Sequence, residues 1–285
     1  MENLVNLSYI AAAILFVFGI KMLGHADTAR RGNRISSIGM ALAIIVTLLN
    51  QGLDYRLVLG GIALGSVIGF VAAKRVQMTG MPELVALFNG FGGLASLLVG
   101  WAEYQRSVGN EIVGISLESV HTFTAAVIVL AILIGGITFT GSLYAWGKLS
   151  GKLGGRALTF GGQKAFNAVL ALGIIACGAI FTLAPTAELA YPMLIAVIVL
   201  SLLLGIFAVM PIGGGDMPVV ISLLNSCSGL AACAAGFVIA NNVLIVAGCL
   251  VGASGLILTI IMCKAMNRTL VNVLFSGFGA TAQAS

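Results

Sequence analysis

Two asparagines occupy the same place in a phrase that the chain uses twice. Residues 81–96 read MPELVALFNGFGGLAS and residues 217–232 read MPVVISLLNSCSGLAA, with seven of sixteen positions identical. Asn89 and Asn225 each follow the opening methionine by eight residues, inside an apolar run. A buried amide without a partner costs about 1–3 kcal/mol, so each side chain should face another helix or water. An amide exchanges no proton near neutral pH, but it can hydrogen-bond and orient water.

Hydroxyls and carboxylates accompany the two amides. Thr138 and Ser142 lie four residues apart in GGITFTGSLYAWGK, which places both on one face of a helix. Glu83 lies in the first turn of the first phrase, where a negative charge interacts favourably with the helix dipole. Asp216 directly precedes the second phrase and is predicted to be its N-cap. These groups would line a water-filled seam through the protein.

A smooth face is predicted in the last apolar run, GCLVGASGLILTIIMCK. Gly248, Gly252 and Gly255 lie on it, and Ser254 adds a hydroxyl. Small residues of this kind let membrane helices approach closely. A second interpretation remains open for all these polar groups. The hydroxyls would bond back to their own helices, and the asparagines would only hold helices together.

The composition indicates a membrane protein that crosses the bilayer several times. Of the 285 residues, 60% are hydrophobic and 8% are charged, and 38 are glycine. Continuous apolar runs of about twenty residues fit helices, whereas the strands of a barrel would alternate apolar and polar residues. The net charge of +5 is spread over several loops and does not indicate nucleic-acid binding. The five cysteines all fall in apolar runs without a CxxC pair, and we interpret them as packing residues.

The fold class expected is therefore all-α, a bundle of nine transmembrane helices. Twelve of the fourteen basic residues then lie on one side of the membrane, which places the N-terminus outside and the C-terminus in the cytoplasm. The predicted spans are 4–23, 35–52, 56–73, 81–102, 119–147, 164–184, 188–210, 217–240 and 242–263. The twelve basic residues on the inner side are Lys21, Arg30, Arg31, Arg34, Lys74, Arg75, Lys148, Lys152, Arg156, Lys164, Lys264 and Arg268.

Both phrases start at the inner face, so the internal repeat is predicted to be parallel. Asn89 lies about seven residues past its proline, roughly 10 Å into the membrane at 1.5 Å per residue, and Asn225 matches it. No Asp, Glu, Lys, Arg or His falls at the centre of a predicted span. A proton pathway in this chain would therefore lack a titrating group at mid-depth.

Four segments together resemble one known family. MTGMPELVALFNGFGGLAS, GGITFTGSLYAWGKLSGK, GGGDMPVVISLLNSCSGLAACAAGF and IMCKAMNR are similar, in order, to the membrane part of the β subunit of proton-translocating NAD(P) transhydrogenase. The resemblance covers nearly the whole chain. It implies hydride transfer between NAD(H) and NADP(H) coupled to proton movement, and location in a bacterial inner membrane.

The resemblance also implies roles for single residues. Asn225 matches a channel asparagine and Ser142 a channel serine, while Asp216 matches an inner-face aspartate tied to NADP(H)-dependent switching. Gly255 lies on the helix that senses the nucleotide state. Arg268 matches a basic residue at the hinge.

The remaining candidates follow from these assignments. Asn89 and Thr138 would belong to the proton pathway, with Glu83 or Asp216 gating its inner mouth. The coupling region would comprise Gly252, Ser254, Gly255, Lys264 and Arg268.

Two departures from the family pattern matter. Many members have a histidine where this chain has Asn89, and one branch is thought to supply a histidine from a small membrane subunit, α2. We expect this chain to belong to that branch. The second departure is that the chain stops at Ser285, where the NADP(H) domain should begin. Residues 1–267 are thus expected to form the proton-channel domain and residues 268–285 a linker.

By itself, the chain is expected to bind no nucleotide or metal and to catalyse no hydride transfer. Its expected partners are the soluble α1 and membrane α2 subunits, a second copy of itself in a homodimer, and the lipid bilayer, but no nucleic acid. Two alternatives stay open. One is a stand-alone secondary transporter built on the parallel repeat, which solute uptake by this chain alone would reveal. The other is a passive anchor, in which the polar stripes would tolerate leucine.

Overall fold

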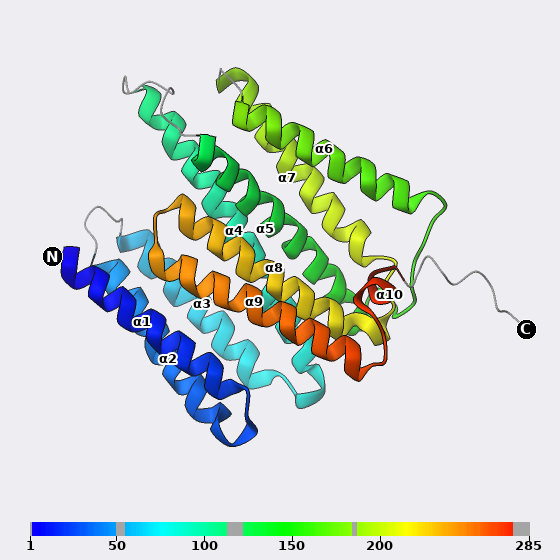
Figure 1. The fold of residues 1–285 in the computed structure, drawn as a ribbon, viewed down its shortest axis with the longest axis horizontal. Helices are drawn as coiled ribbons and strands as arrows, with labels where there is room; N and C mark the ends of the chain where they lie inside the picture. Colours follow the sequence, from blue (N-terminus) through cyan, green and yellow to red (C-terminus); the bar gives the residue numbers. More distant parts are fainter. Residues whose placement is uncertain (1, 50–54, 113–121, 184–186, 276–285) are drawn as a thin grey trace, which may run out of the picture.

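The computed structural model describes residues 2–49, 55–112, 122–183 and 187–275, and all regular structure in these ranges is helical. Nine helices are long, and two single 3-10 turns and one short helix complete the set (Figure 1). The long helices are α1 (Glu2–Leu23), α2 (Ala26–Leu48), α3 (Tyr55–Arg75), α4 (Met81–Ile112), α5 (Thr122–Leu149), α6 (Gln163–Leu183), α7 (Ala187–Val209), α8 (Met217–Val238) and α9 (Asn242–Ala265). The short elements are η1 (Met78–Gly80), η3 (Gly214–Asp216) and α10 (Leu270–Phe275).

Eight of the long helices in the described ranges are apolar enough to cross a membrane. Helix α2 is not among them, because its first third is charged. It begins at Ala26, nine residues before the predicted start of the span at residue 35, so Arg30, Arg31 and Arg34 lie within the helix. Arginine is a good helix former, and a hydropathy pattern detects only the apolar part of such a helix.

Helix α5 lies at the centre of the bundle and contacts α4, α6, α7 and α8. It is apolar all round and half buried, as expected of a helix with neighbours on several sides. Ile128 and Ile132 of α5 pack with Leu194 and Val197 of α7, and all four are fully buried. Figure 1 shows α6 and α7 as a pair on one side of α5, with α8 and α9 on the other.

The repeated phrase begins a helix each time. Helix α4 starts at Met81 and α8 at Met217, and each follows directly on a single 3-10 turn. Pro82 and Pro218 lie in the first turn, where no N–H is needed for the helix. The two helices run in the same direction, because both are antiparallel to α5. We call the end of the bundle where they begin the Asp216 end.

The glycine shared by the two phrases lies where each helix touches the next one along the chain. A Cβ on Gly93 of α4 would lie 2.8 Å from the Gly135 carbonyl oxygen of α5. A Cβ on Gly229 of α8 would collide with the Gly252 nitrogen of α9. Real Cβ atoms do not approach backbone so closely, so only glycine permits either contact. The α4–α5 and α8–α9 pairs thus share one packing device.

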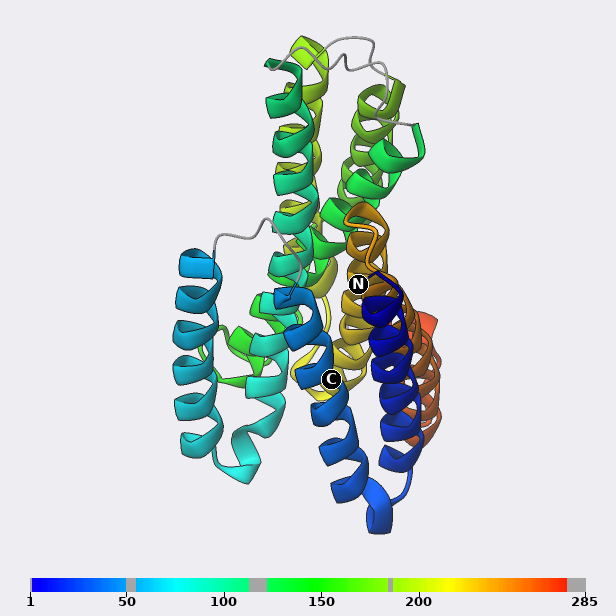
Figure 2. The same ribbon diagram turned by 90° about the vertical axis from the view of Figure 1, so that its left-hand side faces the viewer.

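The N-terminal helices are attached more loosely. Helices α1 and α2 pack as a hairpin in which the Tyr9 and Thr47 hydroxyls lie 3.0 Å apart. Helix α3 has no buried residue, and it stands apart from the other helices in Figure 2. A Cβ added to any of its glycines at positions 61, 65 and 69 would have no atom of another element within 4 Å. In the described ranges α3 is therefore held mainly at its start, where the Tyr55 hydroxyl donates to the Leu48 carbonyl at 3.0 Å.

The α8–α9 contact makes a prediction for two cysteines. The Sγ atoms of Cys233 and Cys249 lie 3.2 Å apart, although 16 residues separate them in the chain. We expect copper–phenanthroline, an oxidant that enters membranes, to join them in a disulfide that mass spectrometry detects in the purified chain. Cys227, on the same helix, should stay a free thiol, and Cys249→Ala should abolish the product. Failure of the pair to cross-link would contradict the register of α8 on α9.

Candidate functional site

The first predicted asparagine contacts the predicted serine. Asn89 Nδ2 of α4 donates a hydrogen bond to Ser142 Oγ of α5 at 2.8 Å. Asn89 is 9% exposed and Ser142 is 1% exposed. The two side chains meet because α4 and α5 touch at Gly93 and also at Gly90, where a Cβ would lie 3.3 Å from the Ser142 Cβ. The result is a polar contact held between two apolar helices.

Thr138 lies one helical turn from Ser142 on α5, as its spacing predicts. It is fully buried beside Gly93, and its hydroxyl has no hydrogen-bond partner among the described residues. From α8, the Ser228 hydroxyl donates to the Asn89 backbone oxygen at 3.2 Å. Three helices therefore direct polar groups to the segment around Asn89.

Asn225 is placed differently from Asn89. It lies on α8, one turn from Ser228, and it is half-buried without a hydrogen bond to a described residue. The two asparagines thus occupy matching places in parallel helices, but only the first is fixed by a neighbour.

Glu83 lines a cavity of about 450 Å³ at the Asp216 end. Gln77 and Thr79 also line it. Leu87 and Trp146 form its apolar part, and Trp146 is one helical turn from Ser142 on α5. The cavity is therefore lined both by a carboxylate and by Trp146, one turn from the serine of the Asn89–Ser142 hydrogen bond.

Asp216 and Arg268, predicted as gate and hinge residues, form an ion pair. The Arg268 Nη1 atom donates to Asp216 Oδ2 at 2.8 Å, and the Asp216 side chain is 11% exposed while that of Arg268 is 46% exposed. The prediction that Asp216 caps α8 is right in position only. It is the N-cap residue, but its side chain makes no capping hydrogen bond, because the carboxylate is directed to Arg268.

The end of α9 explains why Arg268 reaches Asp216. Asn267 adopts a left-handed conformation with φ 53°, which asparagine tolerates better than most residues. The Asn267 and Arg268 nitrogens bond to the carbonyls of Lys264 and Cys263, at 3.0 and 2.9 Å. This is a Schellman turn, which ends the helix and reverses the chain. The reversal carries Arg268 back toward the start of α8.

The predicted coupling residues divide into two groups. Gly252 and Gly255 are buried against α8, where the Ser226 hydroxyl donates to the Gly252 carbonyl at 2.5 Å. Ser254 instead bonds back to the Val251 carbonyl of its own helix and takes no part in the contact. Lys264 is exposed in the last turn of α9. The structure therefore brings the two glycines, but not these two polar residues, to the α8–α9 interface.

Sequence analysis missed several polar groups at these contacts. The Thr259 hydroxyl of α9 lies 3.1 Å from the Ser222 hydroxyl of α8, and both are buried. Ser222 and Ser226 are four residues apart in front of Gly229, a spacing that could have indicated the stripe. Lys148 was expected just beyond the span 119–147 on the inner side, and its burial was not foreseen: it is 3% exposed in the last turn of α5.

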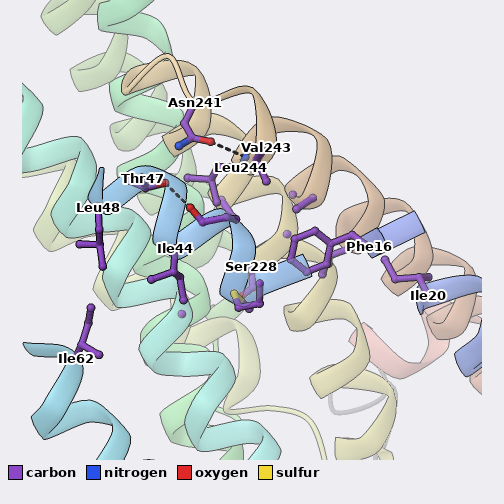
Figure 3. A pocket seen from close by; sticks show the side chains of 18 of the residues that line it. Phe16, Ile20, Ile44, Thr47, Leu48, Ile62, Ser228, Asn241, Val243 and Leu244 are labelled. Atoms are coloured by element: carbon purple, nitrogen blue, oxygen red, sulfur yellow. Dashed lines mark hydrogen bonds between the residues drawn. The ribbon is translucent and has the colours of Figure 1, made fainter. Parts of the chain in front are cut away.

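An apolar cavity of about 570 Å³ is lined by residues of α1, α2 and α3 and by residues of α4, α8 and α9 (Figure 3). Ile44 and Ile62 line one side, Val243 and Leu244 another, and Ser228 contributes a hydroxyl. Gly92 also lines it, three residues from Asn89. No group of three or more His, Cys, Asp or Glu side chains that could hold a metal ion occurs in the described residues.

These features define a class of protein: a multi-pass helical membrane protein whose buried polar side chains meet at glycine contacts. The family model described as NAD(P) transhydrogenase beta subunit matches residues 5–285. The chain belongs to this family. It is 42% identical over 281 residues to NAD(P) transhydrogenase subunit beta of Rhodospirillum rubrum, and the same figures hold for the protein of a named strain of that species. The match covers 98% of this chain and 59% of each relative's length.

The Asp216–Arg268 ion pair makes a prediction for stability. Arg268→Met leaves the buried carboxylate unpaired, so we expect the free energy of unfolding to fall by about 1–3 kcal/mol. Asp216→Asn should cost less, because it removes the charge that needs a partner. In the double variant the two effects should not add, with a coupling energy of about 1 kcal/mol. Thermal unfolding of the purified chain in detergent measures all three, and additive losses would show that the pair makes no net contribution.

Proposed function

We propose that this chain is the membrane domain of a proton-translocating NAD(P) transhydrogenase in a bacterial inner membrane. In the complete enzyme, proton movement through it is coupled to hydride transfer between NAD(H) and NADP(H). The chain has nine spans, with the N-terminus outside and the C-terminus in the cytoplasm, so that the Asp216 end faces the cytoplasm. Residues 268–285 lead toward an NADP(H)-binding domain. The family membership and the polar contacts inside the bundle support this proposal.

The observation that carries the proposal is the hydrogen bond between Asn89 and Ser142. Two apolar helices hold it near a cavity that reaches the carboxylate of Glu83. A buried amide and hydroxyl can orient a chain of water molecules, and Thr138 offers a further hydroxyl one turn away. Leu87 and Trp146 line the apolar part of this cavity. The pathway runs from Glu83 past these two apolar side chains to Asn89, Ser142 and Thr138, with Asn225 beside it.

The Asp216–Arg268 ion pair is the proposed link to the nucleotide. Asp216 starts α8, which carries Asn225, and Arg268 follows α9, which carries Gly252 and Gly255. Pulling on the chain after Arg268 would therefore act on both helices. The bound nucleotide and the state of the pathway bias one two-state element in this way. Lys264 and Ser254 belong to the same segment of α9.

The proposed partners are the α1 and α2 subunits and a second copy of this chain. A membrane helix of the α2 subunit packs against α3 at the mouth of the apolar cavity, where no α3 residue of the described ranges is buried. That place adjoins Gly92 and Ser228, next to the backbone of Asn89. A histidine of the α2 subunit supplies there the titrating group that the predicted spans of this chain lack at mid-depth. No observation favours the stand-alone transporter, since no membrane-spanning helix in the described ranges is unwound along its length.

The test of the pathway uses the complete enzyme in lipid vesicles. We expect Asn89→Leu and Asn225→Leu each to lower proton pumping at least about tenfold, because leucine cannot orient water. Asn167→Leu is the matched control: it removes an amide that bonds the Phe207 carbonyl between α6 and α7, away from the pathway. Asn225→Ala and Asp216→Ala variants that both pump at the normal rate would refute the proposed site.

The location of the α2 subunit has its own test. Gly92→Cys places a thiol on the wall of the apolar cavity, where a Cβ has open space apart from Ser228 at 3.8 Å. We expect a short bifunctional thiol reagent to cross-link this thiol to single cysteines introduced along a membrane helix of the α2 subunit. Val169→Cys, on the exposed side of helix α6, is the control and should not cross-link to the α2 subunit. Efficient cross-linking of the control alone would place the α2 subunit elsewhere.

A further inference from the structure

Lys148 is a buried cation in the last turn of α5. Its side chain is 3% exposed, and Nζ donates hydrogen bonds to the backbone oxygens of Met210 and Ile212, each at 2.6 Å. The Tyr144 ring adds a cation–π contact at 5.3 Å. Neither ion pair found in the described ranges includes this lysine. A buried charge of this kind is tolerated only where strong acceptors replace water.

The two acceptors lie just after the end of α7. Carbonyl groups at a helix C-terminus lack partners within the helix, and a positive charge there interacts favourably with the helix dipole. Lys148 therefore caps the C-terminus of α7 and fixes the first residues of the α7–α8 loop. The loop after α5 supports the same segment, because Leu158 N donates to the Met210 oxygen and Gly214 N to the Gly155 oxygen.

The segment held by Lys148 leads directly to the ion pair. Ile212 is buried, and four residues later Asp216 accepts the hydrogen bond of Arg268. In the other direction along α5, Ser142 precedes Lys148 by six residues, about 9 Å along the helix. One continuous helix thus carries both the partner of Asn89 and the lysine that holds the loop before Asp216.

We propose that Lys148 is a positioning residue that couples the Asn89–Ser142 contact to the Asp216–Arg268 ion pair. It holds the α7–α8 loop in the position that brings Asp216 within reach of Arg268. A displacement of α5 then moves the carboxylate as well as the serine. The coupling role rests on the function proposed above, whereas the holding of the loop rests on the hydrogen bonds alone.

The experiment compares three variants of the complete enzyme in lipid vesicles. Lys148→Met keeps the length of the side chain and removes its charge and donors, Lys148→Arg keeps both, and Lys152→Met is the matched control. Lys152 is an exposed lysine four residues further on, over the Trp146 ring. We expect Lys148→Met to lower the protons pumped per hydride at least about threefold, and the other two variants to keep the normal ratio.

A second comparison separates positioning from general stability. Asp216→Asn should have little further effect in the Lys148→Met background, because the carboxylate is already displaced. A normal pumping ratio in Lys148→Met, or additive effects with Asp216→Asn, would overturn the proposal. If Asp216→Asn and Asn89→Leu alone leave pumping intact, the proposed function fails instead, independently of Lys148.

A milder variant decides the matter where Lys148→Met does not accumulate. Lys148→Gln keeps one donor group, and we expect amide hydrogen exchange at residues 212–216 to rise at least about tenfold with α6 unchanged. This measurement reports the loop itself and does not depend on pumping. Unchanged exchange in the loop, or an equal rise in all helices, would show that Lys148 does not hold it.

Discussion

The structure depends on backbone contact between helices at glycine. In a bilayer the lipid tails are as apolar as the helices, so helices associate through close packing and hydrogen bonds. Gly93 against Gly135, and Gly229 against Gly252, bring two backbones into direct contact. At that separation short side chains such as serine and asparagine reach the neighbouring helix. The buried hydrogen bonds around Asn89 and Ser226 are therefore consequences of where the glycines lie.

The Asp216 end is held together by a second kind of contact, from side chains to backbone carbonyls. Gln163 and Asn167 of α6 both donate to the Phe207 carbonyl of α7, and Lys148 of α5 donates to two carbonyls just beyond it. In the described ranges, one ion pair lies at this end, between Asp216 and Arg268. Helices that lipid alone would not hold in register are thereby fixed near one end, where the chain leaves for its C-terminal segment.

The sequence predicted the elements better than their contacts. Apolar runs located the nine long helices of the described ranges, and the repeated phrase located the starts of α4 and α8, because these signals are local. The start of α2 was missed because arginines continue a helix without continuing its hydropathy. The pairing of Asn89 with Ser142 was expected only as part of a polar seam, since residue type and spacing do not say which helices touch.

Lys148 shows the limit most clearly. Its acceptors are backbone oxygens 62 and 64 residues away, and every residue has such an oxygen. Nothing in the residue types marks Met210 and Ile212 as its partners. The same holds for Cys233 and Cys249, which fit no cysteine motif in the chain but lie together once α8 and α9 are packed.

The glycine contacts also restrict how α8 and α9 can move. Gly248, Gly252 and Gly255 lie three or four residues apart along α9, and each meets backbone or side-chain atoms of α8. A slide of one or two ångströms would push a larger neighbour into that backbone, whereas a slide of a full turn, about 5.4 Å, would set one small residue where another had been. The α8–α9 interface therefore permits a few discrete relative positions of the two helices and disfavours the positions between them.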